Sequence, residues 1–374
     1  MSETKKEDLM TSSSSFVDGT KGILIYRGYD IRDLGANATF EEIIYLLWND
    51  KLPNAGELNT FKAALESQRG LPDRLLKILH EFPYNAHPMA VLRTAVSALG
   101  LLDSHADDVS QKSAREKALL LTAVLPTIIA AWERVRNGKE PIAPRIGLGH
   151  AANFLYMLSG EEPNPDAVAA LDSYLVLLAD HGFNASTFSA RVTTSTGTDF
   201  YSAITSAIGT LKGPAHGGAT QRAMEQFIDA ANYGNINQWF TESREAGKRI
   251  MGIGHRIYKV EDPRARILRP LAQKLAESSG TSQWFNIAQD IEQLARKDDY
   301  FIERDLYANV DYYSAVVLYT IGLPVDQFTC MFAMSRIAGW SSQVLEQLAD
   351  NRLIRPKEGY VGKRDQKFIP LAER

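Results

Sequence analysis

Apolar residues recur at the three- and four-residue spacing of an amphipathic helix over almost the whole chain, and this pattern limits the possible folds more than any other feature. No regular alternation of strands with helices accompanies it, which argues against an α/β fold. The sequence therefore predicts a mostly α protein. The expected helices are Glu41–Asn49, Glu57–Arg69, Asp73–His80, Pro88–Leu102, Gln111–Asn137 with a kink at Pro126, Asp166–Ala179, Ser202–Leu211, Gly218–Ala231, Pro263–Ser278 and Val325–Asn351, the last divisible into two.

The length of 374 residues predicts two domains. The stretch 217–322 is richer in charge than its flanks, and we expect it to be a smaller domain inserted into a larger one formed by residues 16–216 and 323–374. The segment Gly22–Asp33 is bounded by glycine and alternates weakly, which indicates a short hairpin or extended arm. Residues 1–15 are polar, with a serine run at Ser12–Ser15, and are expected to form a disordered tail.

Composition and charge argue against several classes of function. The formal net charge of -4 lacks the basic excess of proteins that bind nucleic acids or membrane surfaces. The single cysteine, Cys330, rules out an intramolecular disulfide, and its apolar neighbours predict a buried position. The seven histidines include no close ligand pair, so no metal site is expected. No apolar signal segment is present, and the apolar stretch Ala118–Trp132 is too short and too mixed to span a bilayer, which predicts a cytoplasmic protein.

Two histidines lie on glycine-rich turns. His216 stands between Gly-Pro and Gly-Gly just before a helical pattern, where the positive end of a helix keeps imidazole neutral and able to donate a hydrogen bond to an enolate oxygen. The alternative is a turn histidine that caps the helix. His255 stands in the segment GIGHRIYK, which also contains Arg256 and Lys259, two cations suited to phosphates. The alternative here is a basic turn exposed to solvent.

Arg264 follows Asp262 and Pro263, which fit an N-cap and the first helical position. A cation in the first turn opposes the helix dipole unless an anion binds at the same end, so Arg264 is a candidate anion ligand. Asp311 lies among aromatic residues, where desolvation raises the pKa of a carboxylate and makes it a better base. A helix N-cap explains Asp311 equally well.

Three further residues match anionic ligands. His181, in the segment DHGFNAS, ends an apolar helical pattern; a structural histidine at a helix end is the alternative. Arg336 lies in the middle of an apolar helical pattern, where it is costly without an anionic partner. Arg355 precedes Pro356 and is a candidate carboxylate ligand, because the planar guanidinium can donate two parallel hydrogen bonds to a carboxylate. The alternative is an ordinary surface arginine.

The order of these motifs is more specific than any one of them. The segments DHGFNAST, GPAHGGA, GIGHRIYKVEDPRA, NVDYYSA, MFAMSRIAGW and RLIRP resemble, in that order, the motifs of the citrate synthase family. The resemblance covers residues 18–362. It implies a nearly all-helical homodimer, in which a small domain closes over the substrates of a large one. It also implies condensation of acetyl-CoA with oxaloacetate and hydrolysis of the citryl thioester, without a metal.

The resemblance also implies roles for the matching positions. Asp311 looks like the base that removes a proton from the acetyl methyl group. His216 looks like the neutral partner that stabilises the enol, and His255 like the acid that protonates the oxaloacetate carbonyl. The residues that match the oxaloacetate ligands are His181, Arg264, Arg336 and Arg355, the last contributed by the other subunit. Arg256 and Lys259 match the region that faces the phosphates of CoA.

Departures from the family pattern concern the pocket wall. Many members have Glu at Gly182, Gly at Ala315 and Leu at Ala215. These differences leave 2-methylcitrate synthase, which uses propionyl-CoA, as the nearest alternative, because one methylene in an apolar pocket discriminates by only about 10–200-fold. More distant alternatives are a catalytically silent relative that forms assemblies and a metal-dependent helical hydrolase.

Overall fold

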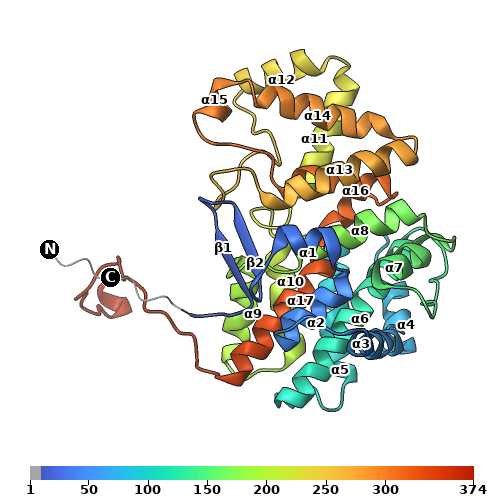
Figure 1. The fold of residues 1–374 in the computed structure, drawn as a ribbon. Helices are drawn as coiled ribbons and strands as arrows, with labels where there is room; N and C mark the ends of the chain where they lie inside the picture. The colour runs from blue at the N-terminus through green and yellow to red at the C-terminus, as the bar shows by residue number, and fades with distance from the viewer. Residues whose placement is uncertain (1–9) are drawn as a thin grey trace.

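The computed structural model describes residues 10–374, and Figure 1 shows that almost all of its regular structure is helical. The strands are β1 (Ser15–Asp18), β2 (Ile23–Tyr26) and β3 (Tyr29–Asp30). The helices of the first half are α1 (Ile31–Asn37), α2 (Phe40–Asn49), α3 (Ala55–Ser67), α4 (Asp73–Glu81), α5 (Pro88–Leu102), α6 (Gln111–Arg136), α7 (His150–Ser159), α8 (Pro165–Leu178), α9 (Ala185–Ser195) and α10 (Phe200–Leu211). Those of the second half are α11 (Ala219–Tyr233), α12 (Ile236–Glu245), α13 (Pro263–Ser278), α14 (Ser282–Ala295), α15 (Asp299–Ile302), α16 (Val310–Thr320), the 3-10 turn η1 (Val325–Gln327), α17 (Phe328–Ala349) and the 3-10 turn η2 (Leu371–Glu373). The predicted mostly α fold is confirmed.

The three strands form one small antiparallel sheet in the order β1-β2-β3. The predicted hairpin region contains β2 and β3, and β1 precedes it. The prediction of a disordered tail is wrong for residues 12–15: Ser14 is buried, and its hydroxyl oxygen lies 2.7 Å from that of Ser342. A serine hydroxyl can form hydrogen bonds with buried protein groups as well as with water, and composition alone does not show which of the two it does. Residues 1–9 of the expected tail lie outside the described residues.

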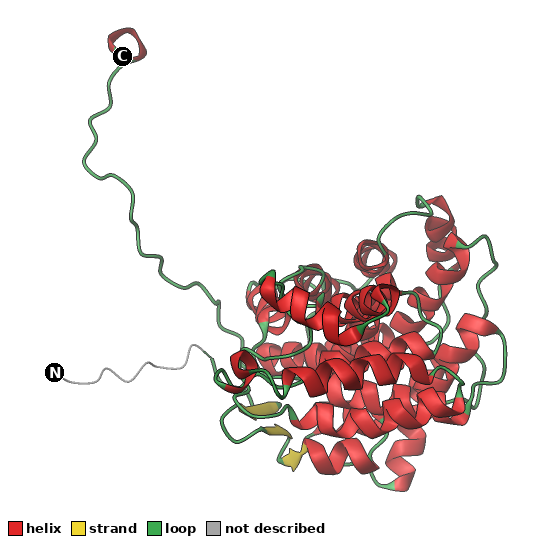
Figure 2. Ribbon diagram, turned by 90° about the horizontal axis from the view of Figure 1, so that it is seen from above, coloured by secondary structure: helices red, strands yellow, loops and turns green. Residues whose placement is uncertain are grey.

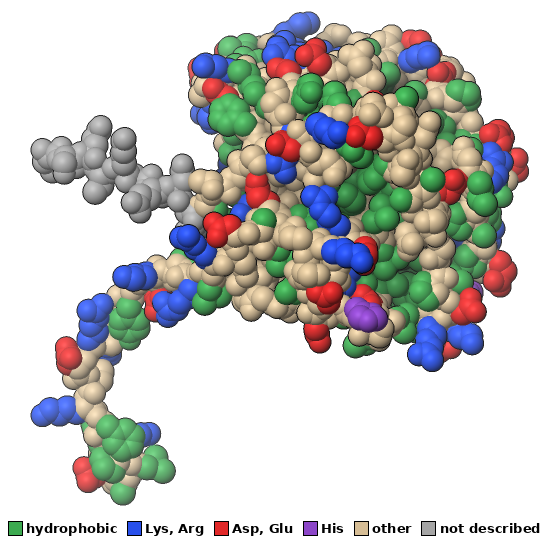
Figure 3. All heavy atoms as spheres, turned by 60° about the horizontal axis from the view of Figure 1, so that its bottom comes forward, with side chains coloured by type: hydrophobic (Ala, Val, Ile, Leu, Met, Phe, Trp, Pro, Cys, Tyr) green, Lys and Arg blue, Asp and Glu red, His purple; other side chains and the backbone are tan. Residues whose placement is uncertain are grey.

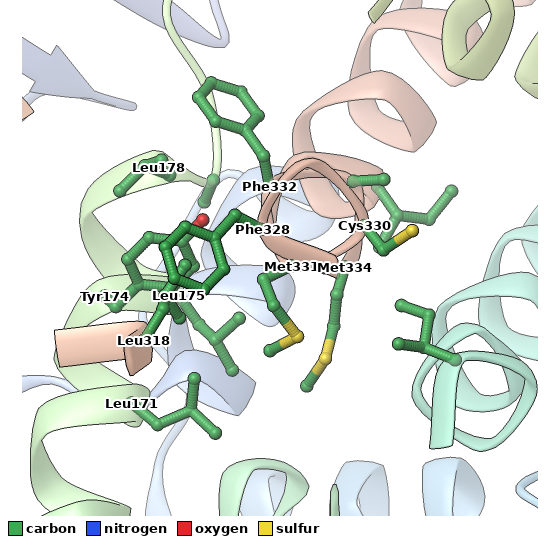
Figure 4. Close-up of a cluster of buried hydrophobic side chains, with 14 of the residues drawn as sticks. Leu171, Tyr174, Leu175, Leu178, Leu318, Phe328, Cys330, Met331, Phe332 and Met334 are labelled. Carbon is green, nitrogen blue, oxygen red and sulfur yellow. The ribbon is translucent and has the colours of Figure 1, made fainter. Parts of the chain in front are cut away.

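The core is built around α17, which is buried over almost its whole length. It is a single helix that continues from η1, so the predicted long segment is not two α-helices. Figure 4 shows Phe328 of α17 facing Tyr174 and Leu175 of α8 and Leu318 of α16, whereas Cys330 lies on the opposite side of α17. Cys330 is buried, as predicted.

Helix α6 is continuous through Pro126. By length and composition it is the one helix of the described residues that is apolar enough to cross a membrane, with a mean hydropathy of 1.5 over its best window. Of that window, 78% is buried inside the structure, which is how the central helix of a packed core looks.

Helices α11, α12, α14 and α15 lie together at one end of the molecule in Figure 1, with α13 and α16 between them and the remaining helices. Packing of α13 against α8 and α16 joins the two groups. Beyond α17 the chain runs as an extended C-terminal segment, residues 350–374, that leaves the body of the subunit (Figure 2).

Candidate active site

The turn that follows α8 carries His181. The helix ends three residues earlier, and Gly182 adopts a left-handed backbone with φ of 57°, so the imidazole lies beyond the helix rather than at its end. Its Nε2 atom is 3.2 Å from the hydroxyl of Tyr258. Burial, followed by the charges of Arg264 and Arg336, holds the pKa of His181 well below its ordinary value. The ring is therefore neutral at pH 7.

His255 lies on a glycine-rich turn, as predicted, and its tautomer follows from its contacts. The Nδ1 atom accepts backbone N–H groups from Ile257 at 3.0 Å and Tyr258 at 3.1 Å. A nitrogen that accepts carries no proton, so the proton of the neutral ring is on Nε2. Burial and the charge of Arg264 lower the pKa of His255 to about 4. The side chain therefore presents an N–H donor.

His216 is held in the opposite tautomer. Its Nε2 atom lies 3.3 Å from the backbone N–H of Ser186, which donates to it, and 2.8 Å from the Ser186 hydroxyl. The proton of the neutral ring is therefore on Nδ1. Burial, with the charge of Arg336, lowers the pKa of His216 to about 4. The helix N-terminus that contacts the ring is that of α9, which contributes Ser186, rather than that of α11, to which the sequence pointed.

Asp311 lies in the first turn of α16 but does not cap it. Asn309 is the N-cap, and its side-chain oxygen accepts the N–H of Asp311 at 2.9 Å. The N-cap interpretation of Asp311 is therefore wrong, and its carboxylate is left for other partners. The hydroxyl of Thr220 donates to its Oδ1 atom at 2.5 Å. Burial raises the pKa of Asp311, against smaller opposing effects of Thr220 and Arg264.

Arg264 forms a buried ion pair with Asp262, the N-cap of α13. Its Nε and Nη2 atoms donate to the two carboxylate oxygens at 3.0 and 2.8 Å, and both side chains are at most 3% exposed. Burial alone would raise the pKa of Asp262, but the guanidinium outweighs it and the pKa is lowered. The misfit between Arg264 and the helix dipole thus has an internal explanation, because Asp262 supplies the anion. Asp262 also accepts the N–H of Val310 at 3.1 Å and so joins the first turns of α13 and α16.

Arg336 is 2% exposed and has no carboxylate within ion-pair distance among the residues that the structure describes. Its Nε atom donates to the carbonyl oxygen of Leu178 at 2.7 Å, and its guanidinium lies 4.7 Å from the ring centre of Phe332. Burial lowers its pKa to about 10, partly offset by the charge of Asp180. A buried guanidinium without an ion pair is costly, which favours a site that receives an anionic ligand.

These residues come from five segments that lie together: the turn after α8, the turn before α11, the turn that leads into α13, the first turn of α16, and α17. The rings of His181 and His255 are 5.6 Å apart, and the ring of Phe332 lies 6.5 Å from that of His216. The His255 turn also runs beside the segment that leads to Asp311, because Ile253 and Ala308 form an antiparallel bridge. The fold therefore brings three candidate catalytic side chains and three candidate anion-binding side chains to one place.

Beside His216 lies a pocket of about 480 Å³. Its lining residues are Pro214, Ala215, His216, Ala219, Arg222, Arg249, Met251, Gly252, Ile253, Gly254 and Asn309. Sequence reasoning missed Arg222 and Arg249, and the only available signal was their position within about six residues of the two histidine motifs. Arg256 and Lys259 are exposed and lie outside this lining, so they do not form its wall.

Arg355 is exposed on the C-terminal segment, where it lines a second hollow with Arg191, Glu346 and residues of the N-terminal serine run. It makes no hydrogen bond or ion pair with the site residues of its own subunit within residues 10–374. The same described residues contain no group of three His, Cys, Asp or Glu side chains arranged to hold a metal ion.

Comparison with known proteins gives the family. A family model described as "Citrate synthase, C-terminal domain" matches residues 5–357. The chain belongs to the citrate synthase family. "Citrate synthase 2" of Bacillus subtilis is 46% identical over 365 residues, which cover 97% of this chain and 96% of that protein. A "2-methylcitrate synthase" of Mycobacterium tuberculosis is 39% identical over 360 residues, which cover 96% of this chain and 89% of that protein.

Among solved structures, the ternary complex of carboxymethyl coenzyme A and oxaloacetate with citrate synthase from Thermoplasma acidophilum matches with a TM-score of 0.91 and 32% identity. The match covers 99% of this chain and 98% of that one. Membership of the citrate synthase family therefore rests on both sequence and fold over nearly the whole chain.

Proposed function

We propose that the chain condenses acetyl-CoA with oxaloacetate and water to give citrate and CoA. One observation carries the proposal: two neutral histidines are fixed as opposite tautomers, each with one N–H left to donate, beside a carboxylate whose pKa is raised. Such a set can remove a weakly acidic proton and stabilise the oxyanions formed on two substrates. The similarity to enzymes named citrate synthase supports the same activity.

The first step is enolisation of the acetyl group. Asp311 takes a proton from the methyl carbon, and the Nδ1–H of His216 donates a hydrogen bond to the thioester oxygen as negative charge develops there. The raised pKa of Asp311 makes it a stronger base. The low pKa of His216 keeps its ring neutral, so a donor is present without a competing full charge.

The second step is attack of the enol carbon on the oxaloacetate carbonyl. The Nε2–H of His255 donates its proton to the carbonyl oxygen as the carbon–carbon bond forms. Water then hydrolyses the citryl thioester to citrate and CoA. In that step Asp311 gives up the proton that it took, and the His255 ring regains the one that it gave. The two oxaloacetate carboxylates are bound by His181, Arg264 and Arg336, with Arg355 of the partner subunit. Arg336 suits this role because it is a buried cation that lacks an ion pair within residues 10–374 of its own subunit.

Water must be excluded until condensation has occurred, and closure of the small domain over the large one does this. The proposed domains are residues 217–322 and residues 16–216 with 323–374. In this division His255, Arg264 and Asp311 move together, because all three lie between residues 217 and 322.

The CoA chain is proposed to enter through the pocket beside His216. Arg222 and Arg249 line that pocket and can meet the phosphates of CoA. Arg256 and Lys259, which are exposed on the turn that follows His255, are proposed to contribute further positive charge to CoA binding. No tightly bound cofactor takes part, because CoA is a substrate and product.

We further propose a cytoplasmic homodimer with shared active sites. The C-terminal segment that carries Arg355 also carries large apolar side chains that are 58–99% exposed at Tyr360, Val361, Phe368 and Leu371. Figure 3 shows these apolar groups and several cations along a segment that stands clear of the body. A second subunit that covers this segment would bury the apolar groups and receive Arg355.

Replacement of the proposed base tests the function. Asp311→Asn should lower kcat by about 10²–10⁴-fold, the usual contribution of a general base, with an unchanged thermal midpoint. Asp290→Asn, an exposed carboxylate on α14, is the matched control and should keep full activity. A fully active Asp311→Asn variant would exclude the proposed mechanism.

A further inference from the structure

The serine run of the N-terminus reaches the turn that carries His181. The hydroxyl of Ser15, the first residue of β1, donates to Oδ2 of Asp180 at 2.7 Å and accepts the backbone N–H of Gly182 at 2.9 Å. Asp180 and Gly182 are the residues on either side of His181. One hydroxyl, 165 residues distant in sequence from Asp180, therefore holds both neighbours of a proposed oxaloacetate ligand.

The strand paired with β1 holds the same turn by its backbone. Tyr26 of β2 is the register partner of Ser15 and is fully buried. Its hydroxyl lies 2.9 Å from the carbonyl oxygen of Asp180 and 3.2 Å from the backbone N–H of that residue. The sheet thus contacts the turn through one side-chain group, the Asp180 carboxylate, and three backbone groups, the N–H and C=O of Asp180 and the N–H of Gly182.

Asp180 needs the serine because its surroundings offer little else. The carboxylate is fully buried, and burial raises its pKa, partly offset by Arg336 and by the hydrogen bond from Ser15. The next partner of Oδ2 is the Gln343 amide at a long 3.4 Å, and Oδ1 has no hydrogen-bond partner in the described part of the chain. On the other side Gly339 of α17 packs so closely that a Cβ there would lie 2.8 Å from Oδ1. The carboxylate cannot turn to find a different donor without disturbing α17.

The far end of β1 is also fixed. The carbonyl oxygen of Gly19 accepts the N–H of Lys259 at 2.8 Å, and a Cβ on Gly19 would lie only 2.1 Å from the carbonyl oxygen of Ile257. The strand therefore lies between the His181 turn and the His255 turn, and Ser15 cannot shift along it.

We propose that Ser15 is a positioning residue for oxaloacetate, which holds His181 in its binding orientation through Asp180 and Gly182. This rests on the proposed function. A hydrogen bond to a buried carboxylate contributes more free energy than one between neutral groups. Because water does not replace the lost bond at this buried position, its removal loosens the turn. The effect falls on the binding of oxaloacetate and not on the CoA side.

The test is a steady-state comparison of Ser15→Ala, Ser15→Thr and Ser13→Ala in the full chain. Ser13 belongs to the same serine run, but it donates to Glu346 and does not contact the turn, so it is the matched control. Ser15→Ala should raise the KM for oxaloacetate by about tenfold. The KM for acetyl-CoA should stay within about twofold. Ser15→Thr keeps the hydroxyl and should restore most of the lost affinity.

An oxaloacetate KM that is unchanged in Ser15→Ala, or raised equally in Ser13→Ala, would overturn the proposal, as would equal losses in Ser15→Ala and Ser15→Thr. Calorimetric titration with oxaloacetate separates this from the proposed function. An active wild type with an unaffected Ser15→Ala refutes only the positioning role. A wild type that binds oxaloacetate but does not release CoA refutes the proposed function and leaves Ser15 to be judged by the titration.

Discussion

The ion pair between Asp262 and Arg264 has the same local geometry as an exposed pair elsewhere in the chain. Comparison of the two separates the effect of burial on stability from the effect of geometry. Asp30 caps α1 and pairs with Arg32 through the same atoms, with N–H, Nε and Nη2 contacts of 2.8, 2.9 and 2.5 Å. In the Asp262 pair the corresponding distances are 3.0, 3.0 and 2.8 Å. The two motifs differ in exposure: the Arg32 side chain is 62% exposed and that of Arg264 is 3% exposed.

Removal of each aspartate should therefore have different effects on the free energy of unfolding. Asp262→Ala leaves a buried guanidinium without its partner, which costs about 3–5 kcal/mol. It also removes an N-cap, which costs about 1 kcal/mol. Asp30→Ala removes the same kind of cap, but water replaces the aspartate as the partner of the exposed Arg32. Loss of the N-cap therefore accounts for almost all of the decrease in the free energy of unfolding. The difference between the two variants should be about 3 kcal/mol or more.

Urea unfolding at one fixed protein concentration measures both variants, with the slope of the transition checked against wild type. Asp262→Ala should also be nearly inactive, because Asp262 joins the first turns of the helices that carry Arg264 and Asp311. Equal destabilisation by the two substitutions would refute the argument that burial, rather than local geometry, sets the contribution of the pair.

Two further outcomes are expected. If Arg355 serves the site of the partner subunit, mixing inactive Arg336→Ala and Arg355→Ala subunits should restore about one quarter of wild-type activity. Half of the randomly exchanged dimers then contain both variants, and each of these has one intact site out of two. No restoration after demonstrated subunit exchange would exclude the shared site. The pKa values of His216 and His255 are about 4 in the folded chain against 6.5 ordinarily, so the unfolded chain binds protons first and stability should be lost as the pH falls from 6.5 towards 4. His216→Gln should make this fall shallower in urea unfolding, and an unchanged pH dependence would show that the ring is not held neutral by the fold.

Much of the fold could be predicted from periodicity, and the failures have physical causes. The expected Pro88–Leu102 and Pro263–Ser278 agree with α5 and α13 at both ends, because each starts with a helix-initiating proline. The structure contains helices that were not predicted, such as α9 (Ala185–Ser195). This segment is rich in serine and threonine, which have weak intrinsic helix preference, and it is held by packing against α10 and α17.

The candidate site was also only partly predictable from the sequence. The chemistry of His216, His255 and Asp311 was readable from residue type and order. Their tautomers and partners were not, because Ser186 and Thr220 reach them from other segments. The N-cap alternative for Asp311 lay two residues beyond the actual cap, Asn309, since Asn and Asp are both good caps and only the backbone decides between them. Ser15 was read as part of a tail because its partners are remote in sequence.

The most direct test of the proposed chemistry is a steady-state thiol-release assay with oxaloacetate, in which acetyl-CoA and propionyl-CoA are compared on the same preparation. The proposal predicts CoA release with both histidines and Asp311 intact, and a higher kcat/KM for acetyl-CoA than for propionyl-CoA. A clear preference for propionyl-CoA would identify 2-methylcitrate synthesis instead, and no release of CoA from either thioester by the folded protein would contradict the mechanism.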